Sequence, residues 1–392
     1  MVGISSAIQG DQVKVITSLR EMNALRPFWE TMQRHPILDF DFFNLVAKRS
    51  NVVSPCVLAA FHGREPVALV AGRIEEGDLP IRFGYATLAR IPVRQLVLFA
   101  GERMGENAEE SYRSFLTCVD RLLREQRLDL AIFWQVKAGS YEHETIRQTF
   151  KRSRLSVTDE ASKHWLLSLP GSWDDFLKSR THKRRHEFRR LPRVLDRDFG
   201  GQWNIKTYTS FNEATEFIDA VESVAAKTYQ RGLNVGFRRD EENIERVFMD
   251  ALRGRLAGYV LFIRDEPRAF WYCFVYKSVL YPVATGYDPA FRDYEMGTVL
   301  LLRIICDYCG TPIQAIDFGS GDADYKRRFC TDHFQETSIL LFSRSARGRC
   351  LRGLHIATLA GSKLGTQLLD RMRITQWVKT RWRQRLTRQQ IR

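Results

Sequence analysis

The sequence predicts an α/β fold with mixed sheets, arranged as two domains of similar plan. Its 392 residues are enough for two ordinary hydrophobic cores. Short apolar runs of strand length alternate with amphipathic helical patterns in both halves of the chain. A hydrophobic content of 44% and an aromatic content of 12% indicate a folded globular chain.

Several classes of protein are disfavoured by composition. No run approaches the roughly eighteen apolar residues of a membrane-spanning helix. The first residues, MVGISSAIQGDQVKVI, lack the pattern of a secretory signal, so we expect a cytoplasmic protein. Seven scattered cysteines do not indicate a disulfide framework.

The formal charge of +14 comes from two local segments. Residues 344–392 hold thirteen Lys or Arg and one acid, and residues 178–197 hold nine Lys or Arg and two acids. The body of the chain is therefore mildly acidic, and we expect no specific nucleic-acid partner.

In the first half, turns with Gly or Pro join the strands, as in an antiparallel meander. A helix and a buried strand then follow. The predicted strands are 12–16, 56–61, 66–74, 80–85, 95–100 and 128–136, and the helices 21–33, 41–49, 108–126 and 143–150.

The second half repeats this order. Ser172 and Ser210 begin helices with capping signatures, and the first of these helices is predicted to stop at Pro192. The predicted strands are 162–170, 203–209, 258–263, 269–276, 278–286, 311–318 and 337–343, and the helices 172–191, 214–230, 242–254, 290–310 and 319–329.

The two halves can be superimposed by pattern. LAAFHGREPVALVAG corresponds to LFIRDEPRAFWYCF, with Pro66 matching Pro267. The first copy's helix begins ENAEESY, which is acidic and would repel a phosphate, so this copy is predicted to be non-catalytic. We therefore expect domains at 1–160 and 161–345, followed by a basic tail at 346–392.

Residues 281–330 concentrate the functional signals. A turn with Arg292 precedes a helix that begins Met296-Gly297-Thr298. A helix start offers unpaired N–H groups and a positive dipole end, which suit a phosphate. Gly297 has no Cβ to obstruct a bulky anion.

This stretch resembles the pyrophosphate-binding turn of the GNAT acyltransferases. Residues 317–329 also resemble the Asp-x-Gly-x-Gly-Asp-x-x-Tyr-Lys-x-x-Phe pattern of the FemAB-like and CelD-like branch. The family's usual Gly-x-Gly is reduced here to the last Gly, with Tyr294 and Glu295 preceding it. The resemblance implies tandem GNAT-like domains and acetyl-CoA or another acyl-CoA as co-substrate, with no metal.

The resemblance also implies an acceptor, an amine-bearing sugar or a lipid-linked molecule, in polysaccharide or envelope biosynthesis. Pro282 interrupts the strand that many GNAT enzymes splay for pantetheine; an ordinary edge strand is the alternative. The expected catalytic residues are Asp317, Asp322, Tyr325 and Lys326. The expected cofactor-binding residues are Tyr287, Arg292, Met296, Gly297 and Thr298, and the expected substrate-binding residues Arg185, Tyr229, Arg231 and Trp271.

Three other functions remain open at this point. The donor could be an aminoacyl-tRNA, as in the FemAB relatives, or the chain could be an inactive module of a membrane-bound polysaccharide synthase. Asp-x-Gly-x-Gly after a strand also resembles the cofactor turn of methyltransferases that use S-adenosylmethionine, although too little α/β pattern follows it.

Two residue pairs with metal-ligand spacing and the basic tail are the remaining candidate sites. Cys306 and Cys309 are read as a buried helix face, and cationic neighbours oppose a metal at His182 and His186. The tail places Leu364, Leu368 and Met372 among basic residues, which is typical of peripheral binding to an anionic membrane face. A disordered tail and one that docks on an acidic partner are the alternatives.

Overall fold

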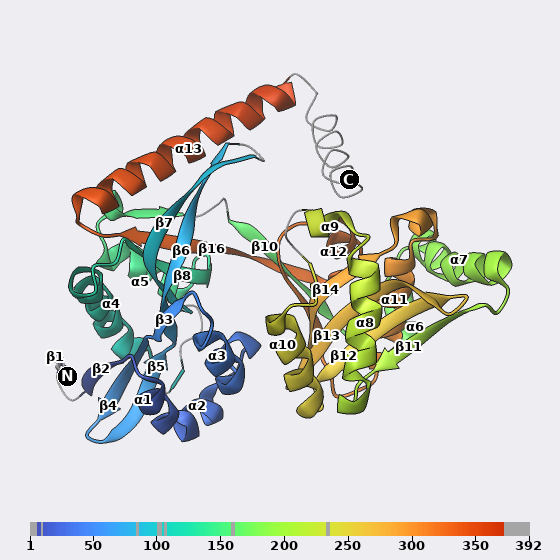
Figure 1. Ribbon diagram of the computed structural model, residues 1–392, viewed down its shortest axis with the longest axis horizontal. Helices are drawn as coiled ribbons and strands as arrows, with labels where there is room; N and C mark the ends of the chain where they lie inside the picture. The colour runs from blue at the N-terminus through green and yellow to red at the C-terminus, as the bar shows by residue number, and fades with distance from the viewer. Residues whose placement is uncertain are drawn as a thin grey trace. The chain divides into compact units, whose positions relative to one another are not determined.

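A computed structural model of the protein describes residues 6–8, 11–83, 86–99, 104–105, 108–157, 161–232 and 236–371 (Figure 1). Its contacts divide the described chain into two compact units, the first from residues up to 163 together with 334–371, and the second from 164–333. The strand around 337–343 was expected in the second domain, but its contacts group it with the first unit.

The first unit contains two sheets. One is antiparallel with the order β1-β2-β4-β5, and the other has the order β3-β6-β7-β8-β16, with β9 paired to β16. In the second sheet β7 and β8 are parallel. The strands are β1 (Ser6–Ile8), β2 (Asp11–Ile16), β3 (Val52–Pro55), β4 (Val57–His62), β5 (Glu65–Val70), β6 (Gly72–Phe83), β7 (Ala86–Leu98), β8 (Leu130–Lys137), β9 (Leu155–Val157) and β16 (Asp332–Phe342).

Helices cover both faces of β4 and β5. Leu58 and Ala60 belong to the core shared with α4, while Val57 and Ala59 belong to the core shared with α1–α3, as the period of two along a strand requires. The helices are α1 (Leu19–Ala24), α2 (Arg26–Met32), α3 (Phe40–Ala47), α4 (Ala108–Glu125), α5 (Tyr141–Thr149) and α13 (Ala346–Arg371), with short 3-10 turns η1 (Pro36–Leu38) and η2 (Arg152–Arg154).

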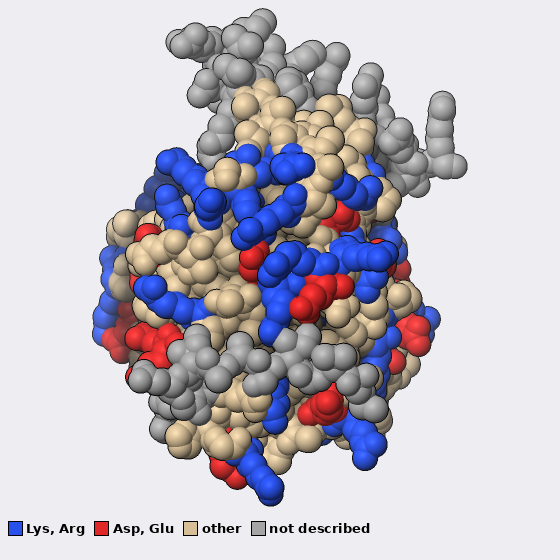
Figure 2. Space-filling model, turned by 90° about the vertical axis from the view of Figure 1, so that its left-hand side faces the viewer, with Lys and Arg blue, Asp and Glu red and all other residues tan. Residues whose placement is uncertain are grey.

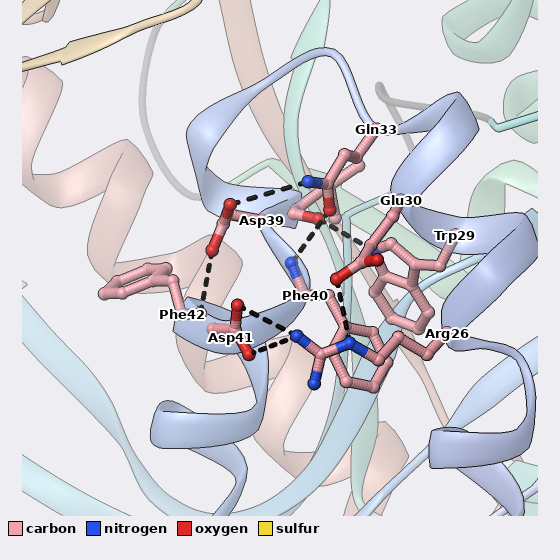
Figure 3. A network of polar contacts seen from close by, with 9 residues as sticks. Arg26, Trp29, Glu30, Gln33, Asp39, Phe40, Asp41 and Phe42 are labelled. Atoms are coloured by element: carbon pink, nitrogen blue, oxygen red, sulfur yellow. Dashed lines mark hydrogen bonds and ion pairs between the residues drawn. The ribbon is translucent and has the colours of Figure 1, made fainter. Parts of the chain in front are cut away.

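A polar network joins α2 to α3 (Figure 3). The Arg26 guanidinium reaches Glu30 at 2.8 Å and Asp41 at 3.0 Å. Beneath it, the indole N–H of buried Trp29 donates to the Leu38 carbonyl at 2.7 Å. These contacts hold α2, η1 and α3 together.

The second unit has one mixed sheet with the order β11-β12-β13-β14-β15-β10. All its neighbours are antiparallel except β14 and β15, which are parallel. The strands are β10 (Ser162–Ser168), β11 (Trp203–Tyr208), β12 (Leu256–Ile263), β13 (Glu266–Tyr276), β14 (Val279–Tyr287) and β15 (Ala315–Ser320). One parallel pair does not make a doubly wound fold, so the sheet does not support the methyltransferase interpretation.

Helices lie on both faces of this sheet (Figure 1). Along β13, Phe270 and Tyr272 pack with α8, while Trp271 and Cys273 pack with α11 and α7. The helices are α6 (Trp173–Lys178), α7 (His182–Phe199), α8 (Ala214–Ala225), α9 (Tyr229–Gly232), α10 (Glu241–Leu252), α11 (Met296–Tyr308) and α12 (Asp324–Phe329), with 3-10 turns η3 (Phe211–Glu213) and η4 (Pro289–Tyr294).

The predicted stop at Pro192 is wrong. Helix α7 continues through Pro192 and ends at Phe199, where Gly200 at φ 50° caps it. Proline removes one N–H from the helix ladder, but buried Leu191 and Leu195 keep the following turn packed on the core. A separate helix, α6, precedes α7 and runs from Trp173 to Lys178. The segment predicted as one helix at 172–191 therefore belongs to two helices.

The predicted repeat of the hairpins is confirmed within each unit. In the β4–β5 hairpin the register shifts between Ala60 and Phe61, opposite Pro66. In the β12–β13 hairpin it shifts between Leu261 and Phe262, opposite Pro267. A proline cannot donate to the ladder, which accounts for a bulge at the same place in both copies.

The beginning of the basic tail is docked on the first unit. Leu351 is 5% exposed and shares a core with Phe342 and Leu79. The Arg347 guanidinium donates to Asp129 at 2.8 Å. Leu364 and Leu368 lie in the part of α13 whose side chains are outside the description, and Met372 and the rest of the tail are outside the described residues. No described helix combines the length and apolar character that crossing a bilayer requires.

Candidate functional site

The start of helix α11 is open to a ligand. Glu295 precedes it in the left-handed region, at φ 46° and ψ 41°, and makes no side-chain cap. Such a conformation is strained for a residue with a side chain and is typical of functional turns. A Cβ added at Gly297 would meet no atom of the described residues within 4 Å, so none of them occupies the space beside this backbone. Among the predicted contacts, Arg292 is exposed and Thr298 half-buried.

Carboxylates also lie at this helix start. Arg328 of α12 lies between Glu295, at 3.1 Å, and Glu187 of α7, at 2.8 Å. The Thr298 hydroxyl donates to the same Glu295 oxygen at 3.3 Å. Arg328 therefore offsets part of the negative charge that would otherwise oppose an anion here.

The two parallel strands separate just beyond their first residues. In the described chain β14 and β15 pair at Val279–Ala315 and Leu280–Ile316. On its other side, β14 shifts register against β13 next to Pro282. The splayed strand predicted from Pro282 is confirmed, and β14 is not an edge strand. Beyond Leu280, no further pairing of β14 with β15 is found in the described chain.

Trp271 connects the two predicted motifs. Its indole N–H donates to the Gly297 carbonyl at 3.0 Å. Its ring meets the Tyr325 ring edge-on, with centroids 5.8 Å apart. The helix start and Tyr325 of the 317–329 motif are therefore neighbours on the same face of the sheet. Tyr287, predicted beside them, is 38% exposed at the end of β14.

Asp317 lies on the other face and contacts a histidine that sequence reasoning missed. Ile316 and Phe318 belong to the core under α11, so the alternating side chain of Asp317 points to the opposite face. There its Oδ1 lies 2.6 Å from Nε2 of His164, and both side chains are 11% exposed. The Gly319 N–H donates to the same carboxylate oxygen at 2.8 Å. Asp317 is also the first residue of β15 beyond its pairing with β14.

The other predicted catalytic residues have distinct environments. Buried Lys326 donates from Nζ to the carbonyls of Gly319, at 3.1 Å, and Ser320, at 2.7 Å, which indicates a role in ordering this turn. Asp322 is paired with Arg327 on the surface. Tyr325 is half-buried between the rings of Trp271 and Phe318.

The structure does not bring all the predicted substrate-binding residues to one place. Arg231 is bound by Glu222 at 2.7 Å, with its side chain 25% exposed, which favours a structural role. The backbone of Tyr229 lies in α9, but its side chain is outside the description. Met296 is buried at the start of α11.

Arg185 lies in a basic groove along α7. The groove has a volume of about 240 Å³ and is lined by six cationic or titratable side chains, namely His182, Arg185, His186, Arg189, Arg190 and Arg193. Cations around both histidines oppose a metal ion. The groove therefore suits an anionic group.

Cys306 and Cys309 were expected on a buried helix face, and the structure agrees only in part. Cys306 is exposed and Cys309 is half-buried, so reading the pair as a buried face is wrong for Cys306. Burial raises the pKa of both thiols, which disfavours the thiolate that redox or metal chemistry needs.

The match to a known protein family lies within the second unit. Residues 182–327 match the family described as acetyltransferase (GNAT) domain. No curated protein matches the chain.

Among solved structures, FemX is 10% identical with a TM-score of 0.52, and the match covers 86% of this chain and 96% of FemX. This likeness shows a shared fold. A tandem GNAT protein from the clavulanic acid biosynthesis pathway is 10% identical with a TM-score of 0.47, covering 83% of this chain and 98% of that one. A conserved protein of unknown function from Bacteroides thetaiotaomicron is 12% identical with a TM-score of 0.48, covering 87% of this chain and 100% of that one.

Proposed function

Because residues 182–327 match the acetyltransferase (GNAT) domain family, we propose that the chain transfers an acyl group from acyl-CoA to an amine. The contact that supports this proposal most strongly is the hydrogen bond from Trp271 to Gly297. It places an open helix start next to the splay of β14 and β15, where a thioester carrier's diphosphate and its acyl arm would need to lie together.

The residues at the helix start fit a diphosphate. The first N–H groups of α11 point out of the helix at its positive dipole end. The space beside Gly297 admits a large anion, and Arg292 is exposed and able to add a forked contact. Met296 begins the same turn, the Thr298 N–H already donates to the Glu295 carbonyl at 2.8 Å, and Tyr287 lies at the end of the splayed strand.

His164 and Asp317 would remove the proton from the attacking amine. An alkyl amine with a pKa near 10.4 is mostly protonated at pH 7, so transfer needs a base. The nitrogen then attacks the thioester carbonyl and the C–S bond breaks, giving an amide and a thiolate. Backbone N–H groups of splayed β14 would stabilise the intermediate oxyanion. Tyr325 would return a proton to the thiolate, and Lys326 would keep the 319–320 turn in shape. Asp322 is the predicted catalytic residue with the least support, because its carboxylate is paired with Arg327.

The donor and acceptor enter from opposite faces in this proposal. The helix start lies on the α11 face, whereas the His164–Asp317 pair lies on the other, and the splay connects them. We propose an acceptor that carries an amine and an anionic group, such as an amino sugar on a lipid-linked or polysaccharide intermediate. The basic groove on α7, with Arg185, supports the anionic part. This role would place the protein at the cytoplasmic face of the membrane.

Calorimetric titration of the full chain with acetyl-CoA tests the donor. Binding that weakens at least tenfold in Arg292→Gln, but not in the exposed-surface control Arg264→Gln, is the expected result. A screen of acyl-CoA donors against amino sugars should then give turnover that drops in Tyr325→Phe. No binding of any acyl-CoA, together with transfer from aminoacyl-tRNA, would favour the second donor class. No transfer from either would favour an inactive module.

A further inference from the structure

A second cavity lies in the first unit, away from the helix start described above. It has a volume of about 380 Å³, within the range of small-molecule sites. Its walls come from the C-terminal half of α4, the end of α5, the η2 turn and the chain just before α13. Residues far apart in the sequence therefore form this surface together.

The cavity is strongly cationic. Five basic side chains line it against one carboxylate, Asp120. Figure 2 views the first unit from the side of α4, where Lys and Arg side chains gather closely. The five basic residues are Arg121, Arg124, Lys151, Arg154 and Arg344.

Asp120 neutralises only part of this charge. It binds Arg154 at 2.6 Å and Arg344 at 3.1 Å. The Arg154 side chain is 13% exposed and also donates to the Phe342 carbonyl at 3.2 Å, so this arginine is part of the scaffold. Among the described residues, no carboxylate lies within ion-pair distance of the remaining three, Arg121, Arg124 and Lys151.

Arg121 also has a buried guanidinium nitrogen at this cavity. Its Nε is buried and has no hydrogen-bond acceptor among the residues that the structure describes, while another nitrogen of the same guanidinium meets Cys118 Sγ at 3.6 Å. A buried charged donor without an acceptor is costly to the folded state, and a small turn of the guanidinium would present it to the cavity. An anion with several oxygens can satisfy such a fork together with its neighbours.

We propose that this cavity binds a phosphate-bearing ligand of at least two negative charges, held by Arg121, Arg124 and Lys151. The ligand class follows from three cations around the cavity that no carboxylate of the described residues neutralises. The proposal does not depend on acyl transfer. It gives the first unit, predicted to be non-catalytic, a binding role of its own.

Titration of the full chain with inorganic pyrophosphate at constant ionic strength tests the proposal. Arg124→Gln and Lys151→Gln should each weaken pyrophosphate binding at least tenfold. Arg113→Gln, which removes an exposed charge from the same helix outside the cavity, should leave binding unchanged. A loss of pyrophosphate binding in Arg292→Gln that is absent from Arg124→Gln and Lys151→Gln would assign the binding to α11 and overturn the proposal.

Two sources of phosphate are distinguished by a second measurement. Co-sedimentation with vesicles of phosphatidic acid and phosphatidylcholine, compared with phosphatidylcholine alone, reports a lipid headgroup. Vesicle binding lost in Arg124→Gln and kept in Arg113→Gln would identify a lipid headgroup as the source. Pyrophosphate binding in the absence of vesicle binding would identify a soluble phosphate as the source. If neither probe distinguishes Arg124→Gln from Arg113→Gln, the cavity is an ordinary charged surface.

Discussion

The indole nitrogen of Trp271 lies 3.0 Å from the carbonyl oxygen of Gly297, so a side chain of the central strand holds the backbone of the α11 start. The same indole ring touches Tyr325 of the second motif. In the proposed function, donor binding and the chemistry beside it would both depend on this side chain.

Trp271→Phe is expected to raise the KM for acetyl-CoA about fivefold, because it removes one hydrogen bond worth about 1 kcal/mol. Steady-state kinetics measure this change. Trp203→Phe is the matched control, since it also loses an indole hydrogen bond, to Asp196 at 2.9 Å, but away from the helix start. Equal effects of the two substitutions would contradict the role assigned to Trp271.

His164→Asn and Asp317→Asn are each expected to lower kcat about 10²-fold to 10⁴-fold by removing the proton acceptor. Calorimetry should show acetyl-CoA affinity unchanged, since the pair lies on the face of the sheet opposite α11. His333→Asn, which alters an exposed histidine stacked on Trp165 at 4.9 Å, is the control. Full turnover in His164→Asn would rule out the pair as the base.

Glu295→Gln is expected to lower the KM for acetyl-CoA about twofold to fivefold, because an exposed like charge near an anion costs about 0.3–1 kcal/mol. The effect should shrink at high salt. Asp324→Asn removes a charge from α12 that is 97% exposed and should have no effect. An increased KM in Glu295→Gln would mean that the carboxylate supports the turn more than it opposes the ligand.

Asp288→Asn is expected to reduce the free energy of unfolding by about 1–3 kcal/mol at pH 7. Burial by itself favours the neutral acid, but hydrogen bonds from the Ala290 N–H, Arg268 and Lys227 outweigh it and lower the pKa of Asp288. The stabilisation is therefore present above the ordinary pKa of about 3.9 and is lost as the pH falls toward the lower folded value.

Urea unfolding at several pH values measures this difference. The gap between wild type and Asp288→Asn should narrow between about pH 4 and pH 2, where the wild-type carboxylate also becomes protonated. Asp293→Asn, an exposed neighbour in η4, serves as the control. A gap that stays constant over that range would show that charge is not the source of the stabilisation.

Leu351→Ala is expected to destabilise the protein by about 2–4 kcal/mol, because Leu351 joins α13 to the core of the first unit. Leu354→Ala, on the same helix and 40% exposed, should cost less than about 0.5 kcal/mol. Thermal unfolding of both variants measures the difference. Similar melting temperatures would indicate that α13 is not docked in solution.

Much of the fold was accessible to sequence reasoning because its signals are local. Pro66 and Pro267 each follow a short turn, and a proline restricts the ladder wherever it occurs, so the matching hairpins could be predicted. Pro282 likewise predicted the splay. Gly297 and Arg292 lie within one turn, where the link between sequence and geometry is direct.

His164 could not be found in that way. It lies 153 residues before Asp317, and the contact exists because β10 pairs with β15 in antiparallel register. No motif surrounds His164, and pairing partners in a sheet are not encoded by neighbouring residues. Its only sequence signal is a titratable residue next to the apolar run Trp165-Leu166-Leu167 of the strand SKHWLLSLP. The helix end predicted at Pro192 was wrong for a related reason, because the packing of Leu191 and Leu195 on the core overrides a local helix-breaking signal.

The pairing of β16 with β8 has a consequence for biosynthesis. During translation the ribosome must pass residue 342 before the sheet begun near the amino terminus can acquire this partner. Until then the exposed edge of β8 is a candidate for chaperone capture or for strand exchange between nascent copies. An amino-terminal fragment ending at residue 163 would retain that unprotected edge permanently, and we expect it to aggregate when expressed alone.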